Sequence, residues 1–155
     1  MALASLNTSE TANKGRAVEL SHPATQTTIG IRFYVMGADS AEFKRIQRDQ
    51  ETVRMAKQKR MRGGYYFNTP EESEANALDL LVGLTTGWDE DIKDTSGAVT
   101  GVRKEIELNE GEFIPFSKDA VRSIYADLGF SWIREQIDSE MVNRRDFLPS
   151  AKRSL

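Results

Sequence analysis

The only imidazole of the chain, His22, is the side chain best suited to acid–base or nucleophilic catalysis near neutral pH. It stands directly before Pro23, in a polar segment that is typical of a turn. A Ser-His-Asp arrangement would have to be built around His22, and its Cys-His variant is excluded because the chain has no cysteine. We interpret His22 as an exposed turn residue, so the sequence predicts no catalytic residue and a protein that is not an enzyme.

An acidic run directly after Trp88 is the second stretch that could carry chemistry, because calcium prefers carboxylate oxygens. The run contains Asp89, Glu90, Asp91 and Asp94. Calcium loops of the EF-hand type place their acids at alternating positions around a central glycine, whereas most of these acids are contiguous. We therefore interpret the run as a solvated or partner-facing segment, and no metal site is expected.

Motifs that hold phosphates, dinucleotides or zinc do not occur in the sequence. A phosphate cradle needs glycines at fixed spacing between a strand and a helix. The glycines at 63–64, and those at 97 and 101, have neither that spacing nor that context. The common zinc sites need cysteines, which the chain lacks. The sequence therefore predicts no cofactor.

The composition is that of one soluble domain with much exposed surface. A chain of 155 residues is long enough for one main core. Hydrophobic residues make up 39% of it, charged residues make up 29%, and the mean hydropathy is −0.52. The first residues lack the apolar region of a secretory signal, and no eighteen apolar residues run together. We therefore expect a cytoplasmic protein that does not enter membranes.

The net charge of −3 conceals two neighbouring segments of opposite charge. Between Lys44 and Arg62 there are eight basic residues and two acids. Between Glu71 and Asp94 there are eight acids and only one basic residue, Lys93. Such a division predicts electrostatic contacts, either within one molecule or between copies.

Hydrophobic periodicity divides the N-terminal half into three parts. Residues 1–16 show no periodicity and predict a flexible arm. Residues 17–36 alternate apolar and polar side chains and predict a β-hairpin. Residues 40–62 predict a charged helix, opened by the capping-box spacing from Asp39 to Glu42. Because its apolar stripe is thin, this helix is expected to project from the core.

The C-terminal half is dominated by helical patterns. Thr69-Pro70 is a strong start signal for a helix that is apolar over more than half of its circumference. The acidic stretch 89–101 is interpreted as a loop, followed by a short strand region at 102–108. Two further helices are expected, one after Ser117 and one over 131–145.

Together these patterns predict an α+β fold that is mainly a helical bundle of about four helices. The β-hairpin, the charged helix and a helical core at 70–149 form a single domain over 17–149, and residues 150–155 are expected to fray. The inward face of the bundle is expected to consist of Leu78, Leu81, Val82, Trp88, Val121, Ile124, Tyr125, Ile133 and Ile137.

The basic segment could bind either nucleic acid or protein. Tyr65, Tyr66 and Phe67 follow it, and cations beside aromatic rings suit phosphates and bases. The chain is acidic overall, with a pI of about 5.3, and its cations are spread around the helix. A solvated helix, or one that docks on an acidic protein surface, is therefore favoured, and nucleic acid is not the expected partner.

Large aromatic side chains could serve either as core or as binding hot spots. As a hypothesis, partner binding is assigned to four of them and to two cations of the basic helix. These candidates are Trp88, Tyr125, Trp132, Phe147, Arg54 and Lys57.

An ordered series of short motifs spans residues 75–149. It consists of an apolar helix ending in Gly87-Trp88, an acidic loop, Phe113-Ile114-Pro115-Phe116-Ser117, Ala120-Val121 with Ile124-Tyr125, Trp132-Ile133 with Gln136-Ile137, and Asp146-Phe147-Leu148. This order resembles that of the tail assembly chaperones of long-tailed bacteriophages. Upstream, Gly37-Ala38-Asp39-Ser40 after a short strand is similar to larger members of that family.

The resemblance implies a small, mainly helical protein of the host cytoplasm. Such a protein binds the long tape-measure protein, keeps it soluble and helps to bring tail-tube subunits to it, and this chain could also self-associate. A structural subunit of the virion, such as a tube, connector or minor head protein, is the alternative. A nucleic-acid-binding protein that uses the basic helix is a third, weaker reading.

Overall fold

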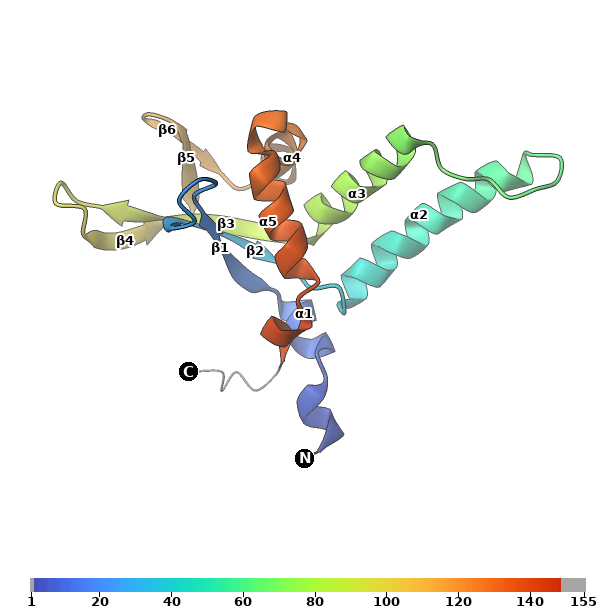
Figure 1. The fold of residues 1–155 in the computed structure, drawn as a ribbon, viewed down its shortest axis with the longest axis horizontal. Coiled ribbons are helices and arrows are strands. Elements are labelled where there is room, and N and C mark those ends of the chain that lie inside the picture. The colour runs from blue at the N-terminus through green and yellow to red at the C-terminus, as the bar shows by residue number, and fades with distance from the viewer. Residues whose placement is uncertain (1, 149–155) are drawn as a thin grey trace.

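The computed structural model describes residues 2–148 and has an α+β fold built around a sheet (Figure 1). Helices make up 48% and strands 25%, and the strands form a four-stranded antiparallel sheet and a separate two-stranded one. The prediction of a mainly helical bundle of about four helices was therefore wrong. The reason lies in the acidic, glycine-bearing stretch after residue 84, which forms strands instead of a loop.

The main sheet has the order β1-β2-β3-β4, with antiparallel neighbours throughout. Its strands are β1 (Arg16–Ser21), β2 (Thr28–Val35), β3 (Thr85–Lys93) and β4 (Val99–Arg103). The hairpin predicted over 17–36 is confirmed as β1 and β2, which place Val18 opposite Phe33. The second sheet consists of β5 (Glu105–Asn109) and β6 (Glu112–Pro115).

Three acids of the run, Asp89, Glu90 and Asp91, lie in β3, where the neighbouring strand supplies counter-charge. Arg32 of β2 donates from Nε to Asp89 at 2.7 Å and from Nη2 to Asp91 at 2.8 Å. Tyr34 also donates its hydroxyl hydrogen to Asp89, and this bond raises the pKa of Tyr34. Opposite charges on paired strands stabilise a sheet, so the run is compatible with a strand only in the presence of β2.

Eight helical segments accompany the sheets within residues 2–148. They are η1 (Leu3–Leu6), α1 (Ser9–Lys14), α2 (Ala41–Lys59), α3 (Pro70–Leu84), α4 (Lys118–Ala126), η2 (Leu128–Phe130), α5 (Ser131–Met141) and η3 (Arg144–Phe147). The start signals at Thr69 and Ser117 are confirmed, since both side chains cap their helices. The cap of α2 is Ser40, whose Oγ accepts a hydrogen bond from the amide of Phe43, and not Asp39.

The N-terminal segment is folded, so the predicted flexible arm over 1–16 was wrong for the residues of α1. Ala12 of α1 is fully buried. Helix α1 packs closely on Gly37 at this point. A Cβ added to Gly37 would lie 3.0 Å from atoms of both Ala12 and Phe147. One buried alanine produces no periodic pattern, so this contact has no signal in the sequence. The frayed tail expected at 150–155 lies outside the described residues.

The core occupies one face of the main sheet, under α4, α5 and the last turns of α3 (Figure 1). The ring of Phe33 lies 5.4 Å from that of Trp88 and 6.0 Å from that of Tyr125. The hydroxyl of Tyr125 forms a 2.7 Å hydrogen bond with the hydroxyl of Thr85, and burial raises the pKa of Tyr125. Eight of the nine residues expected on the bundle face are buried, and Leu78 is half-buried against them. The membership of the core was therefore predicted well, although its scaffold was not.

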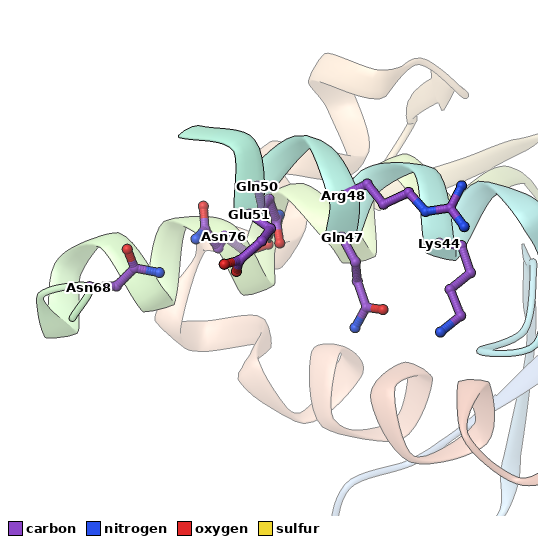
Figure 2. A pocket seen from close by; sticks show the side chains of 7 residues that line it. All are labelled: Lys44, Gln47, Arg48, Gln50, Glu51, Asn68 and Asn76. Atoms are coloured by element: carbon purple, nitrogen blue, oxygen red, sulfur yellow. Dashed lines mark hydrogen bonds between the residues drawn. The ribbon is translucent and has the colours of Figure 1, made fainter. Parts of the chain in front are cut away.

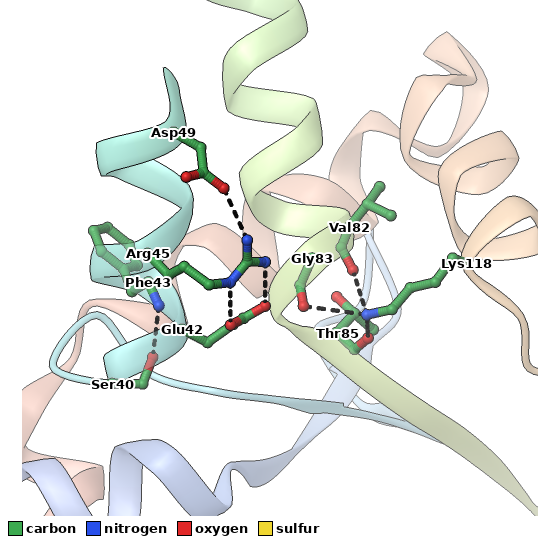
Figure 3. A network of polar contacts seen from close by, with 9 residues as sticks. All are labelled: Ser40, Glu42, Phe43, Arg45, Asp49, Val82, Gly83, Thr85 and Lys118. Atoms are coloured by element: carbon green, nitrogen blue, oxygen red, sulfur yellow. Dashed lines mark hydrogen bonds and ion pairs between the residues drawn. The ribbon is translucent and has the colours of Figure 1, made fainter. Parts of the chain in front are cut away.

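The C-terminal end of α3 is held by a lysine from the start of α4 (Figure 3). The ammonium of Lys118 donates to the carbonyl oxygens of Val82, Gly83 and Thr85 at 3.0, 3.1 and 2.7 Å. The last carbonyls of a helix lack intrahelical partners, and a cation there also interacts favourably with the helix dipole. Desolvation by the surrounding protein lowers the pKa of Lys118. The contact joins α3, β3 and α4 at one point.

A Lys118→Met variant is expected to lose about 1 to 2 kcal/mol of unfolding free energy. This value lies at the lower end for bonds to charged groups because Lys118 as a whole is an exposed residue. Urea unfolding followed by circular dichroism measures it. Arg122→Met on the same helix is the control, since Arg122 pairs with Asp79 at the surface and its loss is expected to cost less than about 0.5 kcal/mol. Equal losses in both variants would refute the assigned role of Lys118.

Candidate functional site

Helices α2 and α3 form a two-helix arm that projects from the sheet (Figure 1). Near its base, Ile46 of α2 is buried and Phe43 packs against the core. Further out the apolar residues of α2 are exposed, Val53 by 57% and Met55 by 47%. The outer part of the arm therefore has no core of its own, which agrees with the predicted projection of the charged helix.

The tip of the arm is fixed by Arg54, one of the two cations assigned to partner binding. Its side chain is 9% exposed and donates to the side chains of Glu51 and Gln58 at 2.8 Å and to the carbonyl oxygen of Tyr66 at 3.1 Å. The bond to Glu51 raises the pKa of Arg54 and lowers that of Glu51. The guanidinium also lies 4.0 Å from the ring centre of Tyr65, a cation–π contact. Arg54 therefore positions the connector between α2 and α3 and is not available to a partner.

Lys57, the second cation of that pair, forms a brace on the same connector. It makes an ion pair with Glu72 of α3, and its ammonium lies 5.6 Å from the ring centre of Tyr66. The hydroxyl of Tyr66 donates to the other oxygen of Glu72 at 2.7 Å. Glu72 in addition accepts from the amide of Thr69 and so completes the capping box of α3. The basic and acidic segments thus meet within one molecule at this point.

These braces leave an aromatic pair exposed at the end of the arm. Tyr65 is 51% and Phe67 76% exposed, and their rings lie 4.7 Å apart. Gly63 and Gly64, just before them, adopt φ angles of +83° and +84°, which favour glycine and allow the chain to reverse. We name Tyr65 and Phe67 the tip pair. It is an apolar surface exposed to water, a common property of protein-binding sites.

Most cations of the basic segment form no ion pair with a carboxylate of residues 2–148. Of the eight, only Arg45, Arg54 and Lys57 form ion pairs with carboxylates in the described part of the chain. The five that form none there are Lys44, Arg48, Lys59, Arg60 and Arg62. The arm therefore presents positive charge to solvent along α2 and next to the tip pair.

A polar groove of about 490 Å³ lies along the arm (Figure 2). Every side chain that lines it is polar or charged. Its cations are Lys44 and Arg48, and the carboxamides of Gln47, Asn68 and Asn76 face it as well. We name this feature the arm groove. It offers positive charge and hydrogen-bonding groups in one place, and no apolar floor for a drug-like ligand.

The other candidates for partner binding lie in or against the core, away from the arm. Trp88, Tyr125 and Phe147 are each 2% exposed, and Trp132 is half-buried against the core. The sequence pattern indicated Tyr65 and Phe67 only as aromatic residues that could stack on bases, and not as a protein-binding surface. The signal that could have singled them out is three consecutive aromatic residues between a glycine pair and a helix start, a position that favours exposure.

His22 lies exposed in the turn between β1 and β2, as the sequence analysis expected. Its Nδ1 accepts hydrogen bonds from the amides of Ala24 and Thr25 at 3.1 and 3.2 Å. Among residues 2–148, no three metal-ligating side chains come together. Within the same range, no helix is both long and apolar enough to span a bilayer.

An Arg54→Leu variant is expected to release the connector while leaving the core folded. Gln58 accepts from both Arg54 and the amide of Tyr66, so the loss of Arg54 weakens the protection of that amide. Hydrogen exchange of the Tyr66 amide is expected to become at least about tenfold faster, since local opening is governed by such contacts. Arg48→Leu, which removes an unpaired cation from the same helix, should leave the exchange unchanged. Unaltered exchange in Arg54→Leu would show that the connector does not depend on this side chain.

Comparison with protein-family models, with curated proteins and with solved structures finds no match to this chain.

Proposed function

We propose that this protein is a tail assembly chaperone that binds the tape-measure protein of a long-tailed bacteriophage in the host cytoplasm. In this role it has no catalytic activity and helps to bring tail-tube subunits to the tape-measure protein. Two things support the proposal: the motif order over residues 75–149 and the exposed binding surface on the arm. Because Trp88 and Tyr125 are buried, we expect the tape-measure protein to contact the arm and not these two residues.

The observation that carries the proposal is the exposure of the tip pair. Phe67 is 76% exposed and packs on the ring of Tyr65, which in turn lies against Arg54. Aromatic side chains dominate the energetics of binding. Arg60 and Arg62 stand beside the pair without ion-pair partners in the described chain.

This surface suits a long amphipathic helix that carries acidic residues beside its apolar stripe. The apolar stripe would contact Tyr65 and Phe67, and the acids would contact the free arginines. By the same resemblance, the tape-measure protein is a long helical chain that needs its apolar surface covered before it is enclosed in the tail. The tip of the arm is the part of the molecule best shaped for that contact.

Co-expression with the tape-measure protein of the same phage tests the proposal. The tape-measure protein is expected to become soluble and to co-purify with this protein, and mass spectrometry of purified particles is expected not to detect this protein. A tape-measure protein that stays insoluble and does not co-purify would eliminate the chaperone function.

A structural subunit of the virion is the second candidate, and the projections of the molecule favour it. The arm and the β-hairpins extend away from the core on different sides (Figure 1). Extended elements of this kind often pack on neighbouring copies in an assembly. Stoichiometric amounts of this protein in purified particles would support this candidate over the chaperone.

Nucleic-acid binding is the third candidate, favoured only by the free cations beside the tip pair. Binding to DNA that weakens steeply between low and high salt would support it, because neutralising several phosphates releases counter-ions. We expect no such steep binding.

A further inference from the structure

Two parts of the molecule carry charges of opposite sign that form no ion pair within the described chain. The five free cations lie on α2 and in the connector that follows it. Hairpin β5–β6 carries four acids that form no ion pair with any residue of the described chain: Glu105, Glu107, Glu110 and Glu112. Two cations, Arg103 and Lys104, precede the hairpin, and Arg103 stacks 4.1 Å from the ring centre of Phe113. The negative charge is therefore concentrated at the turn.

The turn of the β5–β6 hairpin has a defined shape. Gly111 adopts a φ of +79°, and its amide donates to Glu107 at 2.8 Å. Asn109 donates from its side chain to Glu112 at 2.7 Å. Glu110 at the apex is exposed, and its carboxylate makes no hydrogen bond within residues 2–148. The turn is thus a narrow, ordered and acidic projection.

The arm groove has the complementary properties. It contains one acid, Glu51, but that carboxylate is already bonded to Arg54. The groove therefore presents the unpaired charges of Lys44 and Arg48. The side chains of Gln47, Asn68 and Asn76 make no hydrogen bond within residues 2–148, so they are available to carboxylate and peptide groups of a partner. Figure 2 shows Lys44 and Gln47 reaching out from α2 on the groove side.

We propose that the β5–β6 hairpin of one copy of this protein docks into the arm groove of a second copy. The hairpin and the arm extend from different sides of the core (Figure 1), so one chain cannot bring its own hairpin into its own groove. Charge complementarity between a narrow acidic turn and a cationic groove selects a second copy as the occupant. This inference goes beyond the proposed function and holds or fails independently of it.

Such a contact joins two different surfaces, so each copy keeps one free hairpin and one free groove. Contacts of this heterologous kind build open chains, or rings when the rotation between copies closes. Because the surfaces meet through exposed charges, the association is expected to be strong at low ionic strength and weak at high ionic strength.

Sedimentation velocity of the purified full chain over a range of concentrations tests the proposal. Two charge-reversed variants are compared, Lys44→Glu/Arg48→Glu in the groove and Glu110→Lys/Glu112→Lys in the hairpin. A third variant combines all four changes and so restores opposite charges with their positions exchanged. Glu135→Lys/Asp138→Lys on α5 changes the net charge by the same amount as the hairpin variant and serves as its control. Lys44→Gln/Arg48→Gln removes the groove charge without reversing it.

The wild type is expected to grow in mass with concentration at low salt and to dissociate at high salt. Each two-residue reversal should weaken self-association by about tenfold or more, the variant with all four changes should recover it, and the α5 control should match the wild type. A wild type that stays monomeric at low salt overturns the proposal. So does self-association that persists in the reversed variants, or that the exchange of charges fails to restore. Circular dichroism of each variant confirms that these surface changes leave the fold intact.

Discussion

Replacing Trp88 by alanine is expected to remove about 3 to 5 kcal/mol of unfolding free energy. Trp88 is 2% exposed, and its ring packs against Phe33 at 5.4 Å and Phe116 at 5.3 Å. Its Nε1 also donates to the carbonyl oxygen of Ile114 at 3.0 Å, which joins the main sheet to β6. The variant loses these contacts, opens a cavity and leaves the carbonyl without this donor. Because domains are stable by only about 5 to 15 kcal/mol, urea unfolding should show a variant close to the limit of folding.

Trp132→Ala provides the comparison for Trp88→Ala, because Trp132 is only half-buried at the edge of the core. Its loss is expected to cost about 1 to 2 kcal/mol. A Trp88→Ala variant that keeps wild-type stability but no longer binds its partner would place Trp88 at an interface. That result would support the hypothesis that Trp88 is a binding hot spot and would reject its assignment to the core.

Replacing both residues of the tip pair by alanine is expected to weaken binding of the tape-measure protein by at least about a hundredfold. Hot-spot side chains contribute about 2 kcal/mol or more each when truncated, and tyrosine is among the residues enriched there. The unfolding free energy should change by less than about 0.5 kcal/mol because Tyr65 and Phe67 are 51% and 76% exposed. Calorimetric titration with soluble fragments of the tape-measure protein, together with urea unfolding, separates the two effects.

The matched control for the tip pair is Val99→Ala/Val102→Ala in β4. These valines are 55% and 54% exposed, so they remove apolar surface of a similar kind from another projection. Binding should be unaffected by their loss. Equal weakening in both variants would indicate general apolar adhesion, and wild-type affinity in the tip variant would exclude the tip as the binding surface.

Local signals predicted those parts of the fold whose contacts are close in sequence. Thr69 and Glu72 form the capping box that their spacing indicates, and Ser117 caps α4. The hairpin of β1 and β2 follows from alternation and a short turn. In each case the interacting groups lie within a few residues of each other, so the pattern contains the whole explanation.

Long-range contacts explain where prediction from sequence stopped. The contiguous acids of strand β3 favoured a loop, yet Arg32, 57 residues before Asp89, pairs with Asp89 and Asp91. Arg54 looked like a free cation for a partner because the path of the connector around it was unknown. Only the folded chain places Tyr65 against Arg54 and so leaves Phe67 in water. The charged helix that carries the candidate site was therefore predicted, whereas the exposed residues of the tip pair were not.

The arm is, in topological terms, a single connection between two adjacent strands. Strands β2 and β3 pair directly, with Val35 opposite Thr85, and both helices of the arm lie between these residues. Because the outer part of the arm adds no residue to the core, whole helical turns could be inserted or deleted there while both ends of the connection stay fixed. The entropic cost of closing a connection rises only slowly with its length. The reach of this protein can therefore change over evolution, or by engineering, while the sheet and its core remain the same.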